Sequence, residues 1–287
     1  QAYVEARGLF YPPDPGEKAS SIGGNISTNA GGMRAVKYGV TRDYVRGLEV
    51  VLADGTVMQV GGKQVKDASG LSLKHLLIGS EGTLAVITKC LLRLVPKPEA
   101  SLSVLVPYAD LKTGIQSVLT ILRANANPTA VEFMERKVVA LGEEVTANAA
   151  RVRSLALQNG ALDFIELSDA RQCADIWRVR GALVKAVEAV SEQEPVDIVV
   201  PISRTADFIR FINDLEARSG MQMVSFGHAG DGNVHLCVVR GERDEETWQR
   251  ELHENMDRAY AEAYRLGGVA SGEHGIGLSK RPYFLRQ

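Results

Sequence analysis

The segment Phe226–Leu236, FGHAGDGNVHL, constrains the fold of this chain more than any other segment. Its Gly-Asp-Gly-Asn turn signal lies between two stretches that favour strands, so it predicts an antiparallel hairpin. Folding the chain back about this turn puts His228 and His235 roughly opposite each other. Side chains in opposed positions have Cβ atoms about 4.5–5.5 Å apart, so both imidazoles can reach one cation.

A second glycine-rich segment, Ser271–Gly277 (SGEHGIG), places a carboxylate and an imidazole side by side at Glu273 and His274. Two neutral imidazoles and a carboxylate suit zinc or another divalent transition metal with open coordination positions. The sequence therefore indicates a metal site formed by His228, His235 and Glu273. The alternative is structural, because Asp-Gly and Gly-Asn are ordinary turn signals and histidines beside a turn are often solvated. Three of the chain's five histidines fall in these two segments, which favours the metal site.

The composition is ordinary for a globular protein, since 45% of the 287 residues are hydrophobic and 24% are charged. A chain of this length accommodates two domains. The net charge of −2 provides no global basic field, so we predict no nucleic-acid partner. Cys90, Cys173 and Cys237 form no CxxC pair, which indicates a reduced, cytoplasmic setting. A peripheral membrane association stays open, because a surface patch would not show in the hydropathy.

The pattern of apolar residues predicts an α+β fold. A hairpin is expected over 44–60, around the turn at Asp54-Gly55, and an apolar stretch over 84–95 ends at Pro96 and Pro98, which mark a domain boundary. Beyond it, helical and strand patterns alternate, so helices should cover one face of a sheet. Helices are predicted over 111–124, 147–158, 169–190, 205–219 and 244–266, and strands over 102–106, 163–167, 197–200 and 223–239.

The segment Ser21–Gly39, SIGGNISTNAGGMRAVKYG, is also rich in glycine. We predict a loop here whose bare backbone N–H groups form an anion-binding concavity. The segment has neither the P-loop pattern nor the Rossmann fingerprint. The alternative is a glycine-rich turn that packs two backbones closely. A second glycine loop, Gly79–Thr83 (GSEGT), favours the binding interpretation.

Four motifs occur in a familiar order: IGGNISTNAGG with KYG, a hairpin before LADG, GSEGTLAVIT, and GHAGDGNVH with SGEHGIG. Together they resemble the FAD-linked oxidases and dehydrogenases of the vanillyl-alcohol oxidase fold. The branch is the one that contains D-lactate dehydrogenases, D-2-hydroxyglutarate dehydrogenase and the glycolate oxidase flavoprotein subunit. The resemblance covers nearly the whole chain. It implies an FAD-binding domain over 1–97 that lacks its N-terminal subdomain, an α+β cap domain with an antiparallel sheet over 98–270, and a truncated active-site segment over 271–287 that returns to the FAD domain.

The resemblance also implies site residues. The FAD-lining positions are matched by Pro13, Gly23, Gly24, Asn25, Thr28, Asn29, Gly31, Gly32, Tyr38, Gly39, Glu81, Gly82 and Ile87. His228, His235 and Glu273 match the divalent-metal ligands, and His274 matches the catalytic base. Arg180, in the WRVR stretch that begins at Trp177, matches an arginine that binds the substrate carboxylate. The alternative for Arg180 is a solvated helix face.

The implied reaction is the oxidation of a D-2-hydroxy acid to the 2-oxo acid, with FAD as hydride acceptor and a divalent metal, zinc or manganese. Pro195 stands where dicarboxylate-specific relatives have a lysine, which favours a substrate of the lactate or glycolate type. The electron acceptor is unidentified, with an electron-transfer flavoprotein or a quinone among the candidates, and a homo-oligomer stays open. The chain departs from the family in skipping a cap-domain strand between Val145 and Thr146, and as printed it is expected to bind FAD weakly.

Two other functions remain as alternatives. One is a metal-dependent hydrolase that uses the same His-His-Glu site without a redox cofactor, although it leaves both glycine loops unexplained. The other is a non-catalytic, flavin-binding electron-transfer subunit, which would have no need of His228, His235, Glu273 and His274.

Overall fold

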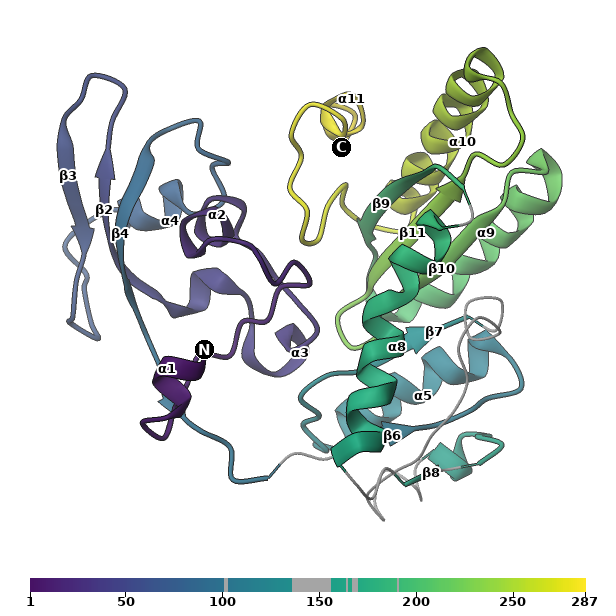
Figure 1. The fold of residues 1–287 in the computed structure, drawn as a ribbon, viewed down its shortest axis with the longest axis horizontal. Coiled ribbons are helices and arrows are strands. Elements are labelled where there is room, and N and C mark those ends of the chain that lie inside the picture. The colour runs from purple at the N-terminus through teal and green to yellow at the C-terminus, as the bar shows by residue number, and fades with distance from the viewer. Residues whose placement is uncertain (101–102, 136–155, 164, 167–169, 190) are drawn as a thin grey trace. The chain divides into compact units, whose positions relative to one another are not determined.

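The computed structural model describes residues 1–100, 103–135, 156–163, 165–166, 170–189 and 191–287 (Figure 1). These residues form two compact units. The N-terminal unit comprises Gln1–Ala100 and Glu273–Ser279, and the C-terminal unit comprises Ser101–Gly272 and Lys280–Gln287. The predicted active-site segment 271–287 is thus shared between the two units. None of the helices in the described residues is both long and apolar enough to cross a lipid bilayer.

The N-terminal unit contains short helices around a small sheet. Its elements are α1 (Ala2–Glu5), β1 (Leu9–Phe10), α2 (Ile22–Thr28), α3 (Ala35–Tyr38), the 3-10 helix η1 (Thr41–Tyr44), β2 (Val45–Val51), β3 (Val57–Gly61), α4 (Leu73–Leu77), β4 (Val86–Leu92) and β5 (Val95–Pro96). β1 pairs with β5, and the larger sheet has the order β3-β2-β4, with every neighbouring pair antiparallel.

The predicted hairpin over 44–60 is confirmed as β2 and β3. Gly55 has a φ of +86° in the connecting turn, a conformation that glycine adopts without steric cost. Leu48 and Val50 of β2 are buried in a cluster with Ile26 of α2 and Ile78, which follows α4. This cluster fixes α2 against the sheet and therefore positions the first glycine-rich segment.

That glycine-rich segment begins with a helix, which corrects the prediction of a loop with bare N–H groups. The Ser21 hydroxyl accepts the Gly24 N–H at 3.0 Å as the N-cap of α2, and Asn29 ends the helix in the left-handed conformation with a φ of 51°. Glycine lowers helix propensity, but Ile26 is fully buried. The packing of this one side chain and the two caps outweigh the propensity.

The C-terminal unit combines an antiparallel sheet with long helices (Figure 1). Its elements are β6 (Val104–Leu105), α5 (Leu111–Arg123), β7 (Glu132–Met134), β8 (Ile165–Glu166), α8 (Ala170–Glu188), β9 (Gln193–Val199), the 3-10 helix η2 (Ile202–Arg204), α9 (Thr205–Ser219), β10 (Met223–His228), β11 (Asn233–Val239), α10 (Glu245–Arg265) and α11 (Arg281–Phe284). The main sheet has the order β7-β10-β11-β9, and β6 pairs with β8. The predicted α+β class and antiparallel sheet are confirmed.

Helices pack on both faces of the four-stranded sheet, whereas the sequence predicted helices on one face. Leu183 and Val187 of α8 pack on side chains of β10 and β11 that include Phe226. α9 packs against β10 and α10 against β9. Because side chains alternate along a strand, His228 and His235 project from the same face as Phe226, the face that α8 covers.

The long helices follow the predicted patterns closely. The predicted ranges 205–219, 111–124 and 244–266 correspond to α9, α5 and α10. The prediction over 147–158 falls mostly outside the described residues, as does the skipped strand between Val145 and Thr146.

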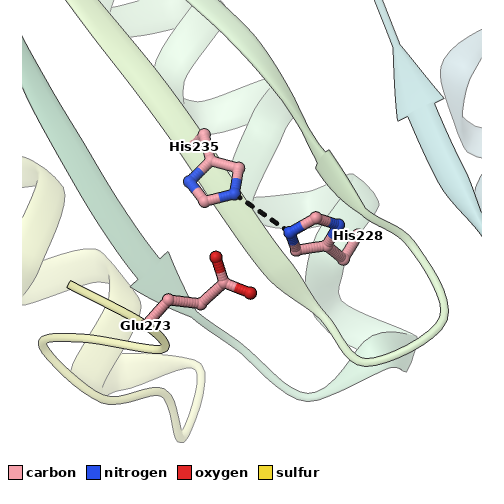
Figure 2. A group of neighbouring side chains, drawn as sticks. All are labelled: His228, His235 and Glu273. Carbon is pink, nitrogen blue, oxygen red and sulfur yellow. Dashed lines mark hydrogen bonds between the residues drawn. The ribbon is translucent and has the colours of Figure 1, made fainter. Parts of the chain in front are cut away.

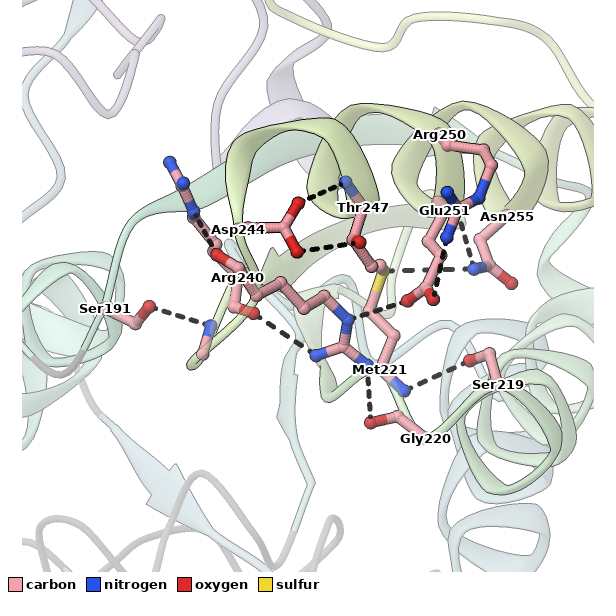
Figure 3. Close-up of polar contacts among 12 residues, drawn as sticks. Ser191, Ser219, Gly220, Met221, Arg240, Asp244, Thr247, Arg250, Glu251 and Asn255 are labelled. Atoms are coloured by element: carbon pink, nitrogen blue, oxygen red, sulfur yellow. Dashed lines mark hydrogen bonds and ion pairs between the residues drawn. The ribbon is translucent and has the colours of Figure 1, made fainter.

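A cluster of polar contacts fixes the start of α10 (Figure 3). Asp244 is the N-cap, and its carboxylate accepts the Thr247 N–H at 2.8 Å and the Thr247 hydroxyl at 3.0 Å. Arg243 donates to the Gly220 carbonyl at 3.0 Å and to Glu251 at 2.7 Å. Arg243 therefore connects the C-terminal end of α9 to the first turns of α10.

The stability contributed by the Asp244 cap should depend on pH. The Thr247 N–H holds the pKa of the Asp244 carboxyl below its ordinary value of 3.8. A lowered folded-state pKa gives stability that is present at neutral pH and lost as the pH falls below about 4. Asp244→Asn keeps a capping oxygen but no charge, so it should be less stable than wild type at pH 7, and this difference should shrink as the pH falls below about 4.

Urea unfolding midpoints at pH 7, 5, 4 and 3 measure this difference. The matched control is Asp214→Asn, an exposed aspartate inside α9. A gap between wild type and Asp244→Asn that stays constant down to pH 3 would contradict the capping role of the charge.

Candidate metal and flavin site

The histidine hairpin is confirmed, but its register differs from the predicted one. Phe226 pairs with His235, and His228 pairs with Asn233. The histidines are therefore diagonal neighbours on one face and not directly opposed. The reason is the position of the turn, which occupies 229–232 and is closed by the Gly232 N–H bonding to the His228 carbonyl at 3.1 Å. Diagonal neighbours still allow long or aromatic side chains to meet.

The two imidazoles point their Nε2 atoms at each other (Figure 2), with 3.2 Å between these atoms. Ligand atoms of His228, His235 and Glu273 all lie within 4.8 Å of one another, and this is a group that can hold a metal ion. Two imidazole nitrogens and a carboxylate oxygen are a ligand set that zinc and related divalent metals accept in open sites. The structure therefore brings together the three predicted metal ligands.

Glu132 orients His228 from the neighbouring strand. It is the cross-strand partner of His228, and its Oε1 lies 2.5 Å from His228 Nδ1. Its Oε2 accepts from Arg180 Nε at 2.9 Å and from Arg180 Nη2 at 2.7 Å. A carboxylate at Nδ1 makes that nitrogen the hydrogen-bond donor, so Nε2 keeps its lone pair for a ligand.

The Glu132 contacts are buried, which strengthens them. The Glu132 side chain is 9% exposed, that of His228 7% and that of Arg180 11%. Arg180 lies about one helical turn before Leu183 on the face of α8 that covers the sheet. It is therefore not on a solvated helix face, and it pairs with a carboxylate of this chain.

A second buried carboxylate fixes the chain just before Glu273. Asp197 is fully buried and is the cross-strand partner of His235. Its Oδ2 accepts from the Ser271 hydroxyl at 2.7 Å and from the Gly272 N–H at 3.0 Å, and it lies 3.3 Å from Lys280 Nζ. Since Gly272 directly precedes Glu273, this network tethers the third predicted ligand beside the hairpin.

Cys237 shares the face of the histidines but adds no thiolate. Burial, together with the nearby Glu188, raises the pKa of this thiol to about 12. The thiol therefore stays protonated at neutral pH, and only a thiolate is a good metal ligand.

The predicted flavin-lining residues all lie in the N-terminal unit. The helix α2 contains Gly23, Gly24, Asn25 and Thr28; Pro13 lies before it, Asn29 is its C-cap, and Gly31 and Gly32 follow. Tyr38 is the last residue of α3, and Gly39 is the C-cap of that helix. Glu81 and Gly82 lie in the turn before β4, and Ile87 lies in β4.

Hydrogen bonds bring these segments together. The Gly79 N–H donates to the Ile26 carbonyl at 3.1 Å, and the Glu81 N–H donates to the Ser27 carbonyl at 2.8 Å. A Cβ on Gly31 would lie 3.2 Å from Glu273 Oε1. The first glycine-rich segment therefore contacts both the GSEGT turn and the predicted metal carboxylate within this unit.

Glu81 holds the SGEHGIG segment. Its carboxylate accepts the Ile276 N–H at 2.6 Å and the Gly277 N–H at 2.9 Å. Gly275 has a φ of +79°, a conformation that favours glycine, and a Cβ on it would lie 2.7 Å from Glu81 Oε1. The side chain of Glu81 thus has a structural partner, and its contact with a flavin stays a prediction. His274 is exposed in the same segment.

Comparisons with known proteins match the chain on both sides of the domain boundary. Residues 97–151 and 142–287 match the family of FAD linked oxidases, C-terminal domain, and residues 1–61 match an FAD binding domain. The fold and these matches define a flavoprotein of the vanillyl-alcohol oxidase fold. The chain belongs to the FAD-linked oxidase family.

Curated relatives cover nearly all of this chain. It is 39% identical to a D-lactate dehydrogenase of Anaerostipes hadrus over 98% of the chain and 66% of the relative. It is 37% identical to the glycolate oxidase subunit GlcD of Bacillus subtilis (strain 168) over 98% of the chain and 65% of the relative. A D-2-hydroxyglutarate dehydrogenase of Xanthomonas citri pv. viticola is 32% identical over 96% of the chain. The chain spans about two thirds of the length of these relatives.

A solved structure shares the fold. An alkyldihydroxyacetonephosphate synthase matches with a TM-score of 0.66 and 14% sequence identity, over 99% of this chain and 60% of that chain. At this identity the likeness concerns the fold alone.

Glu132 is one of the residues of this site that the sequence did not reveal. Glu132→Gln keeps an oxygen for His228 but removes the charge, and we expect it to weaken zinc binding about 10- to 100-fold, the usual effect of losing a partner of a metal-binding histidine. Isothermal titration of the metal-free protein with zinc measures this. His228→Ala is the reference for loss of a ligand.

Glu135→Gln is the matched control. Glu135 directly follows β7, is buried, and accepts from Asn213 Nδ2 at 2.8 Å and from the Ser225 N–H at 3.3 Å. Equal zinc affinities for Glu132→Gln and wild type would show that Glu132 does not position a ligand.

Proposed function

We propose that this chain carries the substrate and metal site of an FAD- and divalent-metal-dependent dehydrogenase for D-2-hydroxy acids. The substrate is of the lactate or glycolate type, and the product is the 2-oxo acid. The observation that carries the proposal is the convergence of His228 Nε2, His235 Nε2 and the Glu273 carboxylate within 4.8 Å, in a chain of the FAD-linked oxidase family.

The residues present fit a divalent cation. Glu132 directs one imidazole lone pair toward the second imidazole, and Asp197 fixes the backbone before the carboxylate. A bound divalent cation would acidify the hydroxyl of a coordinated 2-hydroxy acid. His228, His235 and Glu273 are the residues that would hold it, as zinc or manganese.

The residues of the N-terminal unit fit a flavin. The two glycine segments and the SGEHGIG segment contact one another. Apart from the residues next to it in the chain, no described residue comes within 4 Å of a Cβ built on Gly82, so the backbone of the GSEGT turn is accessible to a ligand. Bound FAD would supply the acceptor for the α-hydrogen as hydride. Its predicted contacts run from Pro13 to Ile87.

Arg180 and His274 receive separate roles. Arg180 binds Glu132 through Nε and Nη2, which fixes the guanidinium. Its Nη1 would then donate to the substrate carboxylate. His274 takes the hydroxyl proton as general base, because an imidazole nitrogen can accept a proton from a nearby hydroxyl and this residue directly follows Glu273 in the chain.

The substrate class rests on Pro195 of β9. This residue pairs with Cys237, two positions along β11 from His235, and it offers no charge to a second carboxylate. That favours a monocarboxylate, in line with the relatives named D-lactate dehydrogenase and glycolate oxidase subunit. The proposal also includes the electron acceptor, which would be an electron-transfer flavoprotein or a quinone. It further includes a location in the cytoplasm, either free or at the membrane surface.

An anaerobic visible spectrum of the protein loaded with FAD and zinc or manganese tests the reaction. We expect the flavin band to bleach on addition of D-lactate or glycolate, because the substrate reduces the flavin directly. L-Lactate is the matched control and should leave the band unchanged.

Other outcomes would redirect the assignment. Bleaching by D-2-hydroxyglutarate alone would make the substrate a dicarboxylate. A flavin band that no 2-hydroxy acid bleaches would contradict the reaction, and the absence of any flavin band would favour the metal-dependent hydrolase.

His274→Ala should slow flavin reduction by about a hundred- to ten-thousand-fold, the usual contribution of a general base, while FAD and metal stay bound. Stopped-flow absorbance measures the reduction, and the metal content is determined in parallel. His253→Ala, an exposed histidine of α10, is the control. Unchanged reduction in His274→Ala would remove this residue as the base.

A further inference from the structure

A pocket with an excess of positive charge lies in the N-terminal unit. Its cavity measures about 280 Å³. We call it the cationic pocket. It is lined by Arg42, Asp43, Val45, Arg46, Lys74, His75 and Arg93. These residues come from η1, β2, α4 and the end of β4, and none of them belongs to the predicted flavin or metal residues.

Within the described residues, the cations of this pocket form no ion pair with a carboxylate. Three arginines, a lysine and a histidine face one carboxylate, that of Asp43, whose Oδ2 accepts the Val40 N–H at 2.8 Å. The ion pairs within the N-terminal unit, all of whose residues up to 100 are described, join other side chains: Lys18–Asp14, Arg34–Asp14, Lys89–Glu49 and Lys97–Glu5. The pocket therefore keeps an excess of positive charge.

Backbone carbonyls hold two of these cations in place. Lys74 Nζ donates to the Val45 carbonyl at 2.7 Å, and Arg42 Nη2 donates to the Ile78 carbonyl at 3.0 Å. Arg42 Nε is buried and makes no hydrogen bond in the described part of the chain. The positive groups are thus fixed before any ligand arrives, and one guanidinium has a donor left over, which is costly in a buried position.

The neighbouring cations also act on one another. Burial lowers the pKa of Lys74, and Arg46 lowers it further. Burial likewise lowers the pKa of His75, and Lys74 and Arg42 add to this effect, while Asp43 opposes it. Like charges in contact with each other are stabilised by a bound anion, because the anion offsets their repulsion.

We propose that the cationic pocket binds a phosphate group, as inorganic phosphate or as a small phosphate monoester. Arginine forks match the oxygens of a phosphate better than a lysine cluster would, and a dianion suits an excess of several positive charges. The volume lies at the lower limit of small-molecule pockets, about 300–1,000 Å³. The pocket thus accommodates a phosphate with a small organic group and excludes a dinucleotide.

Isothermal titration with inorganic phosphate, and separately with glycerol phosphate, tests the proposal. The protein is FAD-loaded, and chloride holds the ionic strength constant. We expect saturable binding of one phosphate per chain that weakens with added salt. Arg46→Gln should weaken it about tenfold, because one hydrogen bond between charged groups is lost.

Arg7→Gln is the matched control. Arg7 is an exposed arginine of the same unit that donates to the Tyr3 carbonyl at 2.8 Å, and its loss should leave the phosphate affinity unchanged. Arg93→Gln, at the exposed edge of the pocket, serves as a second variant if Arg46→Gln does not fold, and it should also weaken binding.

Two results would overturn the proposal. Equal phosphate affinities for the pocket variants and Arg7→Gln would mean that the anion binds elsewhere. Phosphate that binds the flavin-free protein and is displaced by FAD would identify the ligand as the cofactor's own phosphates, and no separate site would remain. Neither result depends on whether the protein oxidises a 2-hydroxy acid.

Discussion

The hydrogen bond between Glu132 and His228 Nδ1 is the interaction on which the candidate metal site depends. An imidazole has two nitrogens, and only one of them can face a cation; the carboxylate of the adjacent strand decides which. The same carboxylate holds Arg180 through its second oxygen. A substitution of Glu132 would therefore affect both the metal ligand His228 and the proposed carboxylate-binding Arg180. Metal binding and substrate binding cannot be changed separately by a substitution at this residue.

Much of this arrangement could be predicted from local sequence. The hairpin around Gly230-Asp231-Gly232 and the bounds of α9 and α10 follow from turn residues and helical periodicity. The grouping of Glu273 with the two histidines follows from the residue types of the two glycine-rich segments and from the family resemblance. The family resemblance was confirmed over residues 1–61 and 97–287. The predicted pairing differs from the observed one by two residues, because the centre of the turn lies one residue nearer to His228 than predicted.

The parts that escaped prediction depend on contacts between distant segments. Glu132 meets His228 only because β7 pairs with β10, and Asp197 meets Ser271 only because the last segment crosses β9. A lone glutamate at the start of a three-residue strand has no periodicity or motif that reveals its partner. The helical state of the Gly23-Gly24 segment was missed for a similar reason, since the burial of Ile26 against the sheet overrides the low helix propensity of glycine.

Asp197 Oδ2 accepts hydrogen bonds from residues on both sides of the segment Glu273–Ser279. Ser271 and Gly272 precede the segment, and Lys280 follows it. The segment that carries Glu273 and His274 is thus a closed loop, clamped at its base by one buried carboxylate. Most of the entropy of closing such a loop is already lost when its base forms. The loop can therefore exchange its amide protons without opening the sheet, once the Glu81 carboxylate releases the N–H groups of Ile276 and Gly277.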